Sequence, residues 1–263
     1  MNGRILIKRA LVLMDADRPP LPNADLLIEG DRIMAIAPEL STPDATEIDA
    51  SGLLIAPGLV NGHFHSHEHF HKGRYDNLPL ELWMHYVRPP LPPPALTPEQ
   101  VYYRTLIGAI EAIRTGTTFV VDDVNHAPYF DPDCIAAVFR AYEEIGLRAL
   151  VSVSLFDQPF YRSVPFFDDE MPAPLRQRLD QQRPPQAAQL LTLAEQLGQA
   201  RRGQRVGFIV APSAPQRCSD RFLVQLRQLA DRHSLPMMMH LLETRLQAVT
   251  GGILYGQSMV AQL

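Results

Sequence analysis

The sequence contains few cysteines and almost no lysine. Its two cysteines, Cys134 and Cys218, lie far apart in the 263-residue chain and form neither a CxxC pair nor an even framework. We therefore expect both to be reduced thiols in a cytoplasmic protein. Lysine occurs only as Lys8 and Lys72, and arginine supplies the other positive charges. We interpret that usage as a codon bias without functional meaning.

Long apolar runs and a strong excess of charge are also missing. No run approaches the roughly 18 apolar residues that span a bilayer, and the N-terminus has no signal-peptide pattern. The net charge of −5 gives no indication of a nucleic-acid or membrane partner. The length fits one large domain, or one medium domain with a small appendage.

Two different patterns divide the chain near residue 57. Residues 1–56 hold short apolar runs separated by turns, including a hairpin pattern around Gly30, which predicts a small all-β layer. From residue 57 onward, five predicted strands alternate with helices, which indicates a parallel sheet. After the strand that ends near residue 65, the expected strands span 117–121, 149–156, 206–210 and 236–242. The expected helices span 97–116, 131–145, 186–201 and 219–233. Residues 159–184 are expected to form an irregular loop.

The first of these strands ends in His63-Phe64-His65, after a Pro-Gly turn. Residues two apart in a strand face the same side, with bases about 6.6 Å apart. Both imidazoles can therefore reach one ion through bonds of about 2.0–2.1 Å. A histidine-rich surface loop or a metal-storage tract is the alternative, since three more histidines alternate up to His71.

Polar residues also follow the other predicted strands, among them Asp122, Asp157, Ser213 and His240. In a (β/α)8 barrel this C-terminal rim carries the catalytic groups. A doubly wound sheet places its site at the same strand ends. Strand-end clustering alone therefore leaves both folds open.

Two longer motifs carry a family resemblance. Pro57-Gly-Leu-Val-Asn-Gly-His63-Phe-His65 resembles the first barrel strand of the amidohydrolase superfamily, and His240-Leu-Leu-Glu243-Thr resembles the fifth strand of its cytosine deaminase and chlorohydrolase-like branch. Residues 211–219 are similar to the loop after strand four in that branch. The resemblance implies an α/β fold in which residues 57–263 form a partial (β/α)8 TIM-type barrel (strands 1–5), preceded by part of a small β-sandwich domain over residues 1–56.

The resemblance also implies one divalent metal ion, with zinc as the first choice and iron as the second. His63, His65 and His240 would be its ligands, and Glu243 would be the general acid/base that carries a proton to the leaving group. Residues 206–213 lack the lysine that bridges two metals in binuclear relatives, which favours one ion. Taken alone, His240 would be interpreted as a core histidine of an apolar strand.

Four further residues are weaker candidates for substrate binding: Trp83, Ser213, Gln216 and His67. Trp83 equally fits the apolar face of a short helix. His67 would stand about 13 Å from His63 in an extended chain, so a solvated loop is the alternative. Asp122 and the following Asp123 either orient the ligand histidines or cap the next helix.

The implied activity is hydrolysis of a carbon–nitrogen bond in a small molecule. Deamination of a cyclic amidine-like base is the first choice, and amide hydrolysis and displacement of a halide are the alternatives. A homo-oligomer is expected only through the resemblance. The family also uses a histidine after strand six and an aspartate after strand eight, yet no histidine follows His240 and the chain ends at Leu263. The competing hypothesis is therefore a truncated, non-catalytic subunit that needs a partner.

Overall fold

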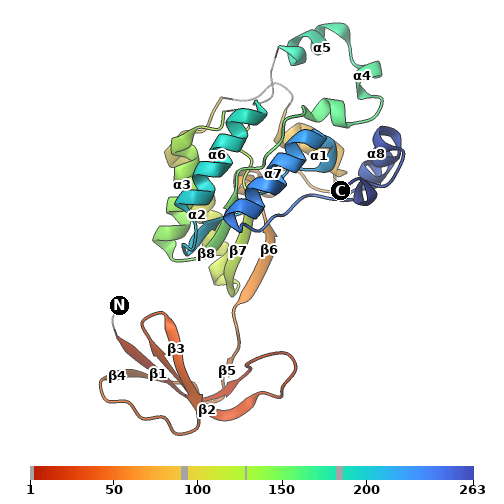
Figure 1. Ribbon diagram of the computed structural model, residues 1–263. Coiled ribbons are helices and arrows are strands. Elements are labelled where there is room, and N and C mark those ends of the chain that lie inside the picture. Colours follow the sequence, from red (N-terminus) through yellow and green to blue (C-terminus); the bar gives the residue numbers. More distant parts are fainter. Residues whose placement is uncertain (1–2, 90–93, 128, 182–185) are drawn as a thin grey trace. The chain divides into compact units, whose positions relative to one another are not determined.

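The computed structural model describes residues 3–89, 94–127, 129–181 and 186–263, and Figure 1 shows their course. The chain forms two compact units, residues 1–59 and residues 60–263. None of the helices in these described ranges is long and apolar enough to cross a membrane.

The first unit is a single five-stranded sheet. Its strands are β1 (Arg4–Val12), β2 (Leu21–Glu29), β3 (Arg32–Ala37), β4 (Ala45–Asp49) and β5 (Leu54–Ile55). The order is β3-β2-β1-β4, with β5 also paired to β1. Gly30, at φ +62°, makes the predicted β2–β3 hairpin turn, because glycine adopts this left-handed conformation without steric cost. One sheet is what the structure shows here, so a sandwich stays a prediction.

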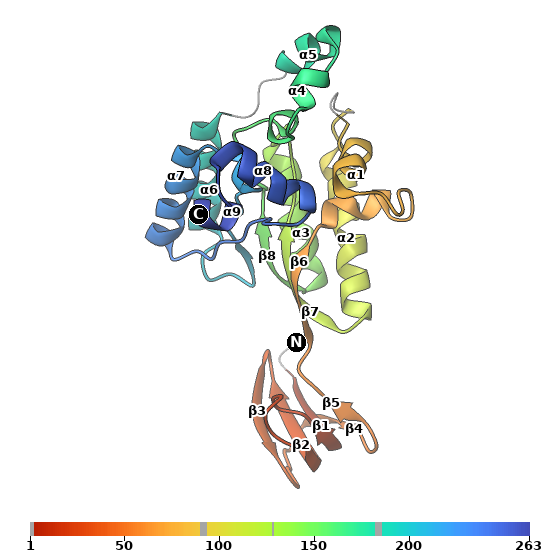
Figure 2. The same cartoon turned by 90° about the vertical axis from the view of Figure 1, so that its right-hand side faces the viewer.

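The second unit alternates strands and helices around a four-stranded sheet. The strands are β6 (Leu59–Phe64), β7 (Thr117–Asp123), β8 (Arg148–Ser152) and β9 (Val206–Phe208), in the order β6-β7-β8-β9. β7, β8 and β9 run parallel, as the alternating pattern predicted. The long helices are α2 (Pro98–Arg114), α3 (Pro132–Ile145), α6 (Ala187–Ala200) and α7 (Asp220–His233), and they follow one another around the sheet (Figure 2).

Local signals begin and end these helices. Thr97 and Gln100 form a reciprocal capping box at the start of α2, which satisfies two backbone N–H groups that the helix leaves free. Asp131 accepts the backbone N–H groups of Asp133 and Cys134 at the start of α3. Gly146, at φ +79°, ends α3 in the left-handed conformation. The core between helices and sheet consists mainly of apolar side chains, with Phe139, Val151, Phe208 and Phe222 among its buried members.

The structure corrects three sequence expectations. The stretch expected as an irregular loop over 159–184 contains η2 (Phe160–Ser163), α4 (Phe167–Glu170) and α5 (Ala173–Asp180), which are too short to show a helical period; its last residues, 182–184, lie outside the described ranges. The strand expected over 149–156 ends at Ser152, because Ser154 has φ +49°. The strand expected over 236–242 is only a one-residue parallel bridge between Val210 and Met237, and Leu242 leaves the extended conformation at φ +55°.

The remaining helices surround the carboxyl ends of the strands. They are η1 (Ser66–His71), α1 (Leu80–Val87), η3 (Pro215–Arg217), α8 (Arg245–Tyr255) and α9 (Met259–Gln262). Only η1 follows its strand closely: it begins two residues after β6 ends and carries His67. The four paired strands do not close on themselves, and a partial eight-stranded barrel therefore stays a prediction.

Candidate metal centre

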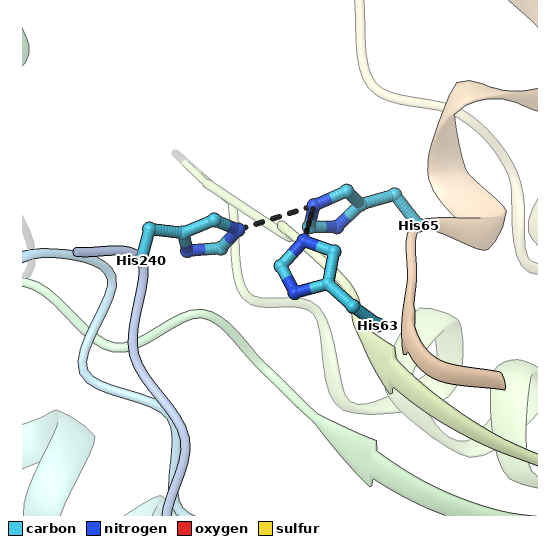
Figure 3. Close-up of side chains that lie close together, drawn as sticks. All are labelled: His63, His65 and His240. Carbon is cyan, nitrogen blue, oxygen red and sulfur yellow. Dashed lines mark hydrogen bonds between the residues drawn. The ribbon is translucent and has the colours of Figure 1, made fainter. Parts of the chain in front are cut away.

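Three histidines from two distant parts of the chain meet at the carboxyl ends of the strands (Figure 3). His63 lies on β6, and His65 follows it at the start of η1. His240 comes 175 residues after His65, where the chain has passed the Met237 bridge. Their imidazole nitrogens lie within 4.8 Å of one another, and this is the one group of three or more such side chains in the described part of the chain.

Backbone carbonyls fix the protonation of two of these rings. His65 Nδ1 lies 2.8 Å from the Asp123 carbonyl oxygen, and His240 Nδ1 lies 2.9 Å from the Ser213 carbonyl oxygen. A carbonyl only accepts, so each Nδ1 must carry the proton and donate it. A neutral ring then has a lone pair on Nε2. The Nε2 atoms of His65 and His240 therefore face each other as two acceptors, only 3.1 Å apart.

Two facing acceptors need a positive group between them. His63 Nε2 lies 3.0 Å from His65 Nε2, so a third nitrogen points at the same place. Imidazole nitrogens bound at about 2.0–2.1 Å to one tetrahedral zinc ion lie about 3.3 Å apart. Both separations from His65 Nε2 are close to that value, and all three ligand nitrogens lie within 4.8 Å of one another, so the donor set fits a single metal ion.

Burial prepares His65 to act as a ligand. Loss of solvent lowers the pKa of His65 below its usual value, with the neighbouring His240 and His63 acting in the same direction and Asp123 opposing them. A histidine must be neutral to bind a metal ion. The environment therefore supplies the required form near neutral pH.

Two aspartates at the end of β7 support the histidines. Asp122 accepts the backbone N–H of Ser66 at 2.8 Å and the hydroxyl of Tyr142 at 2.7 Å, and burial raises its pKa to about 6. Asp123 holds His65 through its carbonyl, while its carboxylate Oδ2 lies 3.8 Å from His240 Nδ1. Asp123 Oδ1 is buried with no hydrogen-bond partner. The second of the two alternatives, helix capping, is wrong, because Asp131 caps α3.

A cavity of about 410 Å³ opens beside the three histidines. His65 and His240 line it, and so do all the residues that the sequence proposed for proton transfer and substrate binding: Glu243, Trp83, Ser213, Gln216 and His67. Trp83 lies on the short helix α1 and also lines the cavity, so its two alternative interpretations are compatible. Gln216 accepts from Gln247 at 3.2 Å. The structure thus places these side chains around one space, and their roles remain proposals.

The expectation of a solvated loop at His67 is wrong. The side chain is 7% exposed, because the chain turns into η1 after His65 instead of staying extended. His67 Nδ1 accepts the backbone N–H of Asn125, and its ring centre lies 5.2 Å from that of His65. The pKa of His67 lies well below its usual value, and burial is the largest cause.

Sequence reasoning missed several polar residues at this site. Glu81 lines the cavity and accepts the hydroxyl of Thr244 at 2.6 Å. Arg88 contacts both His67 and Glu68. Arg217, which is 7% exposed, also lines the cavity. Glu81 and Arg88 belong to no motif, and Arg217 lies in the 211–219 segment but was not singled out there, because a buried arginine has no signature in a single sequence.

Comparisons with known proteins agree with this geometry. The model of the amidohydrolase family matches residues 54–248. A 5-methylthioadenosine/S-adenosylhomocysteine deaminase from Thermococcus sibiricus is 32% identical over 242 residues, which are 92% of this chain and 50% of that protein. A 5′-deoxyadenosine deaminase from Methanothermobacter thermautotrophicus is 32% identical over 245 residues, again 92% of this chain and 50% of the relative. The chain spans about half the length of the curated relatives it matches.

Solved structures share the fold at lower identity. The atrazine chlorohydrolase from Arthrobacter aurescens complexed with zinc superposes with a TM-score of 0.81 at 19% identity, covering 98% of this chain and 57% of that one. An adenosine deaminase from Xanthomonas campestris with bound zinc gives a TM-score of 0.70 at 24% identity, covering 99% and 54%. At these identities the likeness concerns the fold.

Proposed function

The chain belongs to the amidohydrolase family, and from that premise we propose that it is the metal-binding part of a hydrolase that breaks a carbon–nitrogen bond in a small heterocyclic molecule. The observation that carries the proposal is the pair of Nε2 lone pairs on His65 and His240, 3.1 Å apart and aimed at each other. Carbonyl partners prevent either ring from turning this contact into an ordinary hydrogen bond.

The residues present suit one divalent ion. His63, His65 and His240 would hold it, and the unpartnered buried Oδ1 of Asp123 would supply negative charge beside them. Imidazole ligands suit zinc, with iron as the second choice. When bound, such an ion would act as a Lewis acid and lower the pKa of a water molecule bound to it to about 7.

The chain's own side chains supply the proton transfer. Glu243 lines the cavity beside His65 and His240, and its backbone N–H donates to Gln247 Oε1 at 2.6 Å, which anchors this segment. A carboxylate at this position can take a proton from the attacking water and deliver it to the leaving nitrogen. Trp83 and Ser213 lie around the same space and would hold the ring of the substrate.

Deamination is the favoured reaction within this class. Two relatives at 32% identity are named as deaminases, one of 5-methylthioadenosine and S-adenosylhomocysteine and one of 5′-deoxyadenosine. Those names describe an adenine ring, which is a cyclic amidine-like base. The family and the histidine geometry favour a hydrolase over a non-catalytic subunit.

The test is metal content measured beside ammonia release. Purified wild-type chain should hold one zinc ion, and His65→Ala and His240→Ala should each lose it, because three imidazoles are needed to close the site. His233→Ala is the matched control, since His233 lies on α7 and pairs with Glu195. Ammonia release from 5′-deoxyadenosine should stop in a chelator and return with zinc. Full metal content in His240→Ala, or a wild-type chain without metal, would refute the proposal.

A further inference from the structure

Four arginine side chains line a second cavity, of about 830 Å³, that adjoins the metal pocket, and three of them are buried or half-buried, whereas Arg74 is exposed. Arg88 follows α1, Arg104 lies inside α2 and Arg217 ends η3, so three separate segments direct guanidinium groups to one space. Arg104 and Arg217 are only 8% and 7% exposed. Arginine is seldom buried so deeply unless an anion accompanies it.

Protein carboxylates pair with these arginines incompletely. Arg88 donates to Glu68 Oε1 at 3.1 Å, but its Nε is buried without a partner. Arg104 Nε is likewise buried and unpartnered. Within the described part of the chain, neither Arg104 nor Arg217 forms an ion pair with a carboxylate.

Among the described residues, the Arg217 side chain contacts only neutral groups. Its Nε donates to the carbonyl oxygen of Gln158 at 3.2 Å, and its guanidinium lies 4.2 Å from the ring centre of Phe156 and 5.4 Å from that of Phe160. Aromatic faces stabilise a cation but leave most of its N–H groups free. The side chain is therefore held in place with donors still available.

The positive charge of Arg88 acts on the other two arginines. Burial lowers the pKa of Arg104 to about 10, and the nearby Arg88 contributes to the same effect. Burial lowers the pKa of Arg217 to about 10 as well, again with Arg88 contributing. His126 Nε2 is a further buried atom without a partner on the wall of this cavity. Converging cations and unused polar atoms in one enclosed space are the features of an anion site.

We propose that the cavity lined by Arg88, Arg104 and Arg217 binds a carboxylate, and that this carboxylate is part of the substrate. The planar guanidinium groups present paired N–H donors that match carboxylate oxygens. Phe156 and Phe160 supply apolar walls for the part of the molecule that leads to the charged end.

A single negative charge fits the local charge count. Glu68 and Asp122 act on Arg104, and Glu68 pairs with Arg88, so two carboxylates face three guanidinium groups. One positive charge is left over. Arg74 and Asp131 also line the cavity, but both are exposed and their opposite charges leave the remainder unchanged. Asp131 already accepts the N–H groups that start α3, and Asp123 faces the three histidines. A monoanion balances the remainder, whereas a phosphate dianion exceeds it.

The two cavities are neighbours that share wall residues, so one molecule could extend from one to the other. His67, Arg88, Phe160 and Arg217 line each of them. The ring of His67 stands between His65 and Arg88, because it lies 5.2 Å from the ring of His65 and contacts the Arg88 guanidinium. This second half of the inference rests on the proposed function: the reacting heterocycle would lie at the histidines, and its acidic tail would lie among the arginines.

Direct binding tests the anion site without turnover. Isothermal titration calorimetry should show that benzoate binds the wild-type chain at least tenfold more tightly than the neutral, similarly shaped benzamide. Arg104→Gln and Arg217→Gln should each weaken benzoate binding tenfold or more. Arg227→Gln removes the same charge from an exposed helix position paired with Asp231, and it should change binding less than twofold. Circular dichroism of each variant verifies that it is folded.

Three results would overturn the carboxylate site: equal binding of benzoate and benzamide, an unchanged affinity in both folded arginine variants, or inorganic phosphate binding tenfold more tightly than benzoate.

Substrate turnover is then compared for an adenine nucleoside that carries a carboxylate and for its neutral amide. The acid should have at least a tenfold higher kcat/KM, and Arg217→Gln should reduce that ratio. Turnover without this preference would refute the anion site alone, whereas benzoate binding without metal or turnover would refute the proposed function alone.

Discussion

His126 should make the second unit lose stability between pH 7.5 and pH 5. The residue is 9% exposed on the wall of the arginine-lined cavity, and its Nε2 has no hydrogen-bond partner. Burial lowers the pKa of His126 to about 3; the neighbouring Arg104 and Arg88 lower it too, while Asp131 raises it. The unfolded chain protonates this ring near pH 6.5, so it binds more protons than the folded chain throughout this range.

The size of the effect follows from the unfolded state. At pH 5, about 1.5 pH units below the unfolded value, protonation stabilises the unfolded chain by about 2 kcal/mol while the folded ring stays neutral. At pH 7.5 the same contribution is close to zero. The result is insensitive to the folded pKa, because any value well below 5 leaves the folded ring neutral. Stability is therefore lost as the pH falls through 6.5.

The matched variant is His126→Phe, which keeps an aromatic ring but cannot titrate. The turn at this position should persist, because the backbone carbonyl of His126 accepts from Tyr129 and Phe130. Urea unfolding can be followed by the fluorescence of Trp83, the single tryptophan of the chain. The stability of the variant relative to wild type should rise by about 2 kcal/mol between pH 7.5 and pH 5.

Subtraction of the two proteins removes the titration of all other groups. His67, which is within electrostatic reach of His126, has a pKa well below its usual value and stays neutral in both. A stability difference that is constant within about 0.5 kcal/mol over this range would refute the reasoning. An NMR titration gives an independent answer: the ring protons of His126 should not shift between pH 7.5 and pH 5.

Two further predictions concern stability. The free energy of unfolding of Asp122→Asn relative to wild type should rise by about 2 kcal/mol between pH 4 and pH 7 in the same assay. Burial raises the pKa of folded Asp122 to about 6, so ionising this carboxyl above its unfolded pKa of 3.8 destabilises the folded wild type. A difference that does not change with pH would contradict this assignment. In α8, Gly251→Ala should destabilise the chain by about 1–3 kcal/mol, since its Cβ would lie 2.9 Å from Met259 Cγ and 3.1 Å from the Met259 backbone nitrogen. The adjacent Gly252→Ala meets nothing within 4 Å and should stabilise by about 0.5–1 kcal/mol in thermal unfolding; changes of the same sign would contradict the packing argument.

Features coded within a few neighbouring residues were determined by the sequence itself. The start of α2 was readable because Thr97 can cap the helix, Pro98 fits its first position, and Thr97 and Gln100 bond to each other across one helical turn. The end of α3 was readable because Gly146 accepts a conformation that other residues avoid. The pair of His63 and His65 is local in the same sense, since both histidines lie at the end of one strand.

Segments under weaker local control were predicted less well. The stretch over 236–242 is apolar enough for a strand, yet a single bridge at Met237 is all that pairs with the sheet. The segment instead places His240 beside the Ser213 carbonyl and leads into Thr244, which caps the start of α8. Pairing of a strand depends on the neighbouring strand, which a local pattern does not contain.

Only the tertiary structure decided the chemistry of the site. His240 reaches His65 across 175 residues, and the proton positions on both rings depend on the carbonyls of Asp123 and Ser213, which come from two other segments. The sequence could name the histidines through a family resemblance, but it could not show that their lone pairs face each other. The sequence marks none of the three cavity arginines as a binding residue, although Arg217 lies in the 211–219 segment. Each is an ordinary residue of its own segment, and its charge becomes significant only because packing removes water and brings all three to the same space.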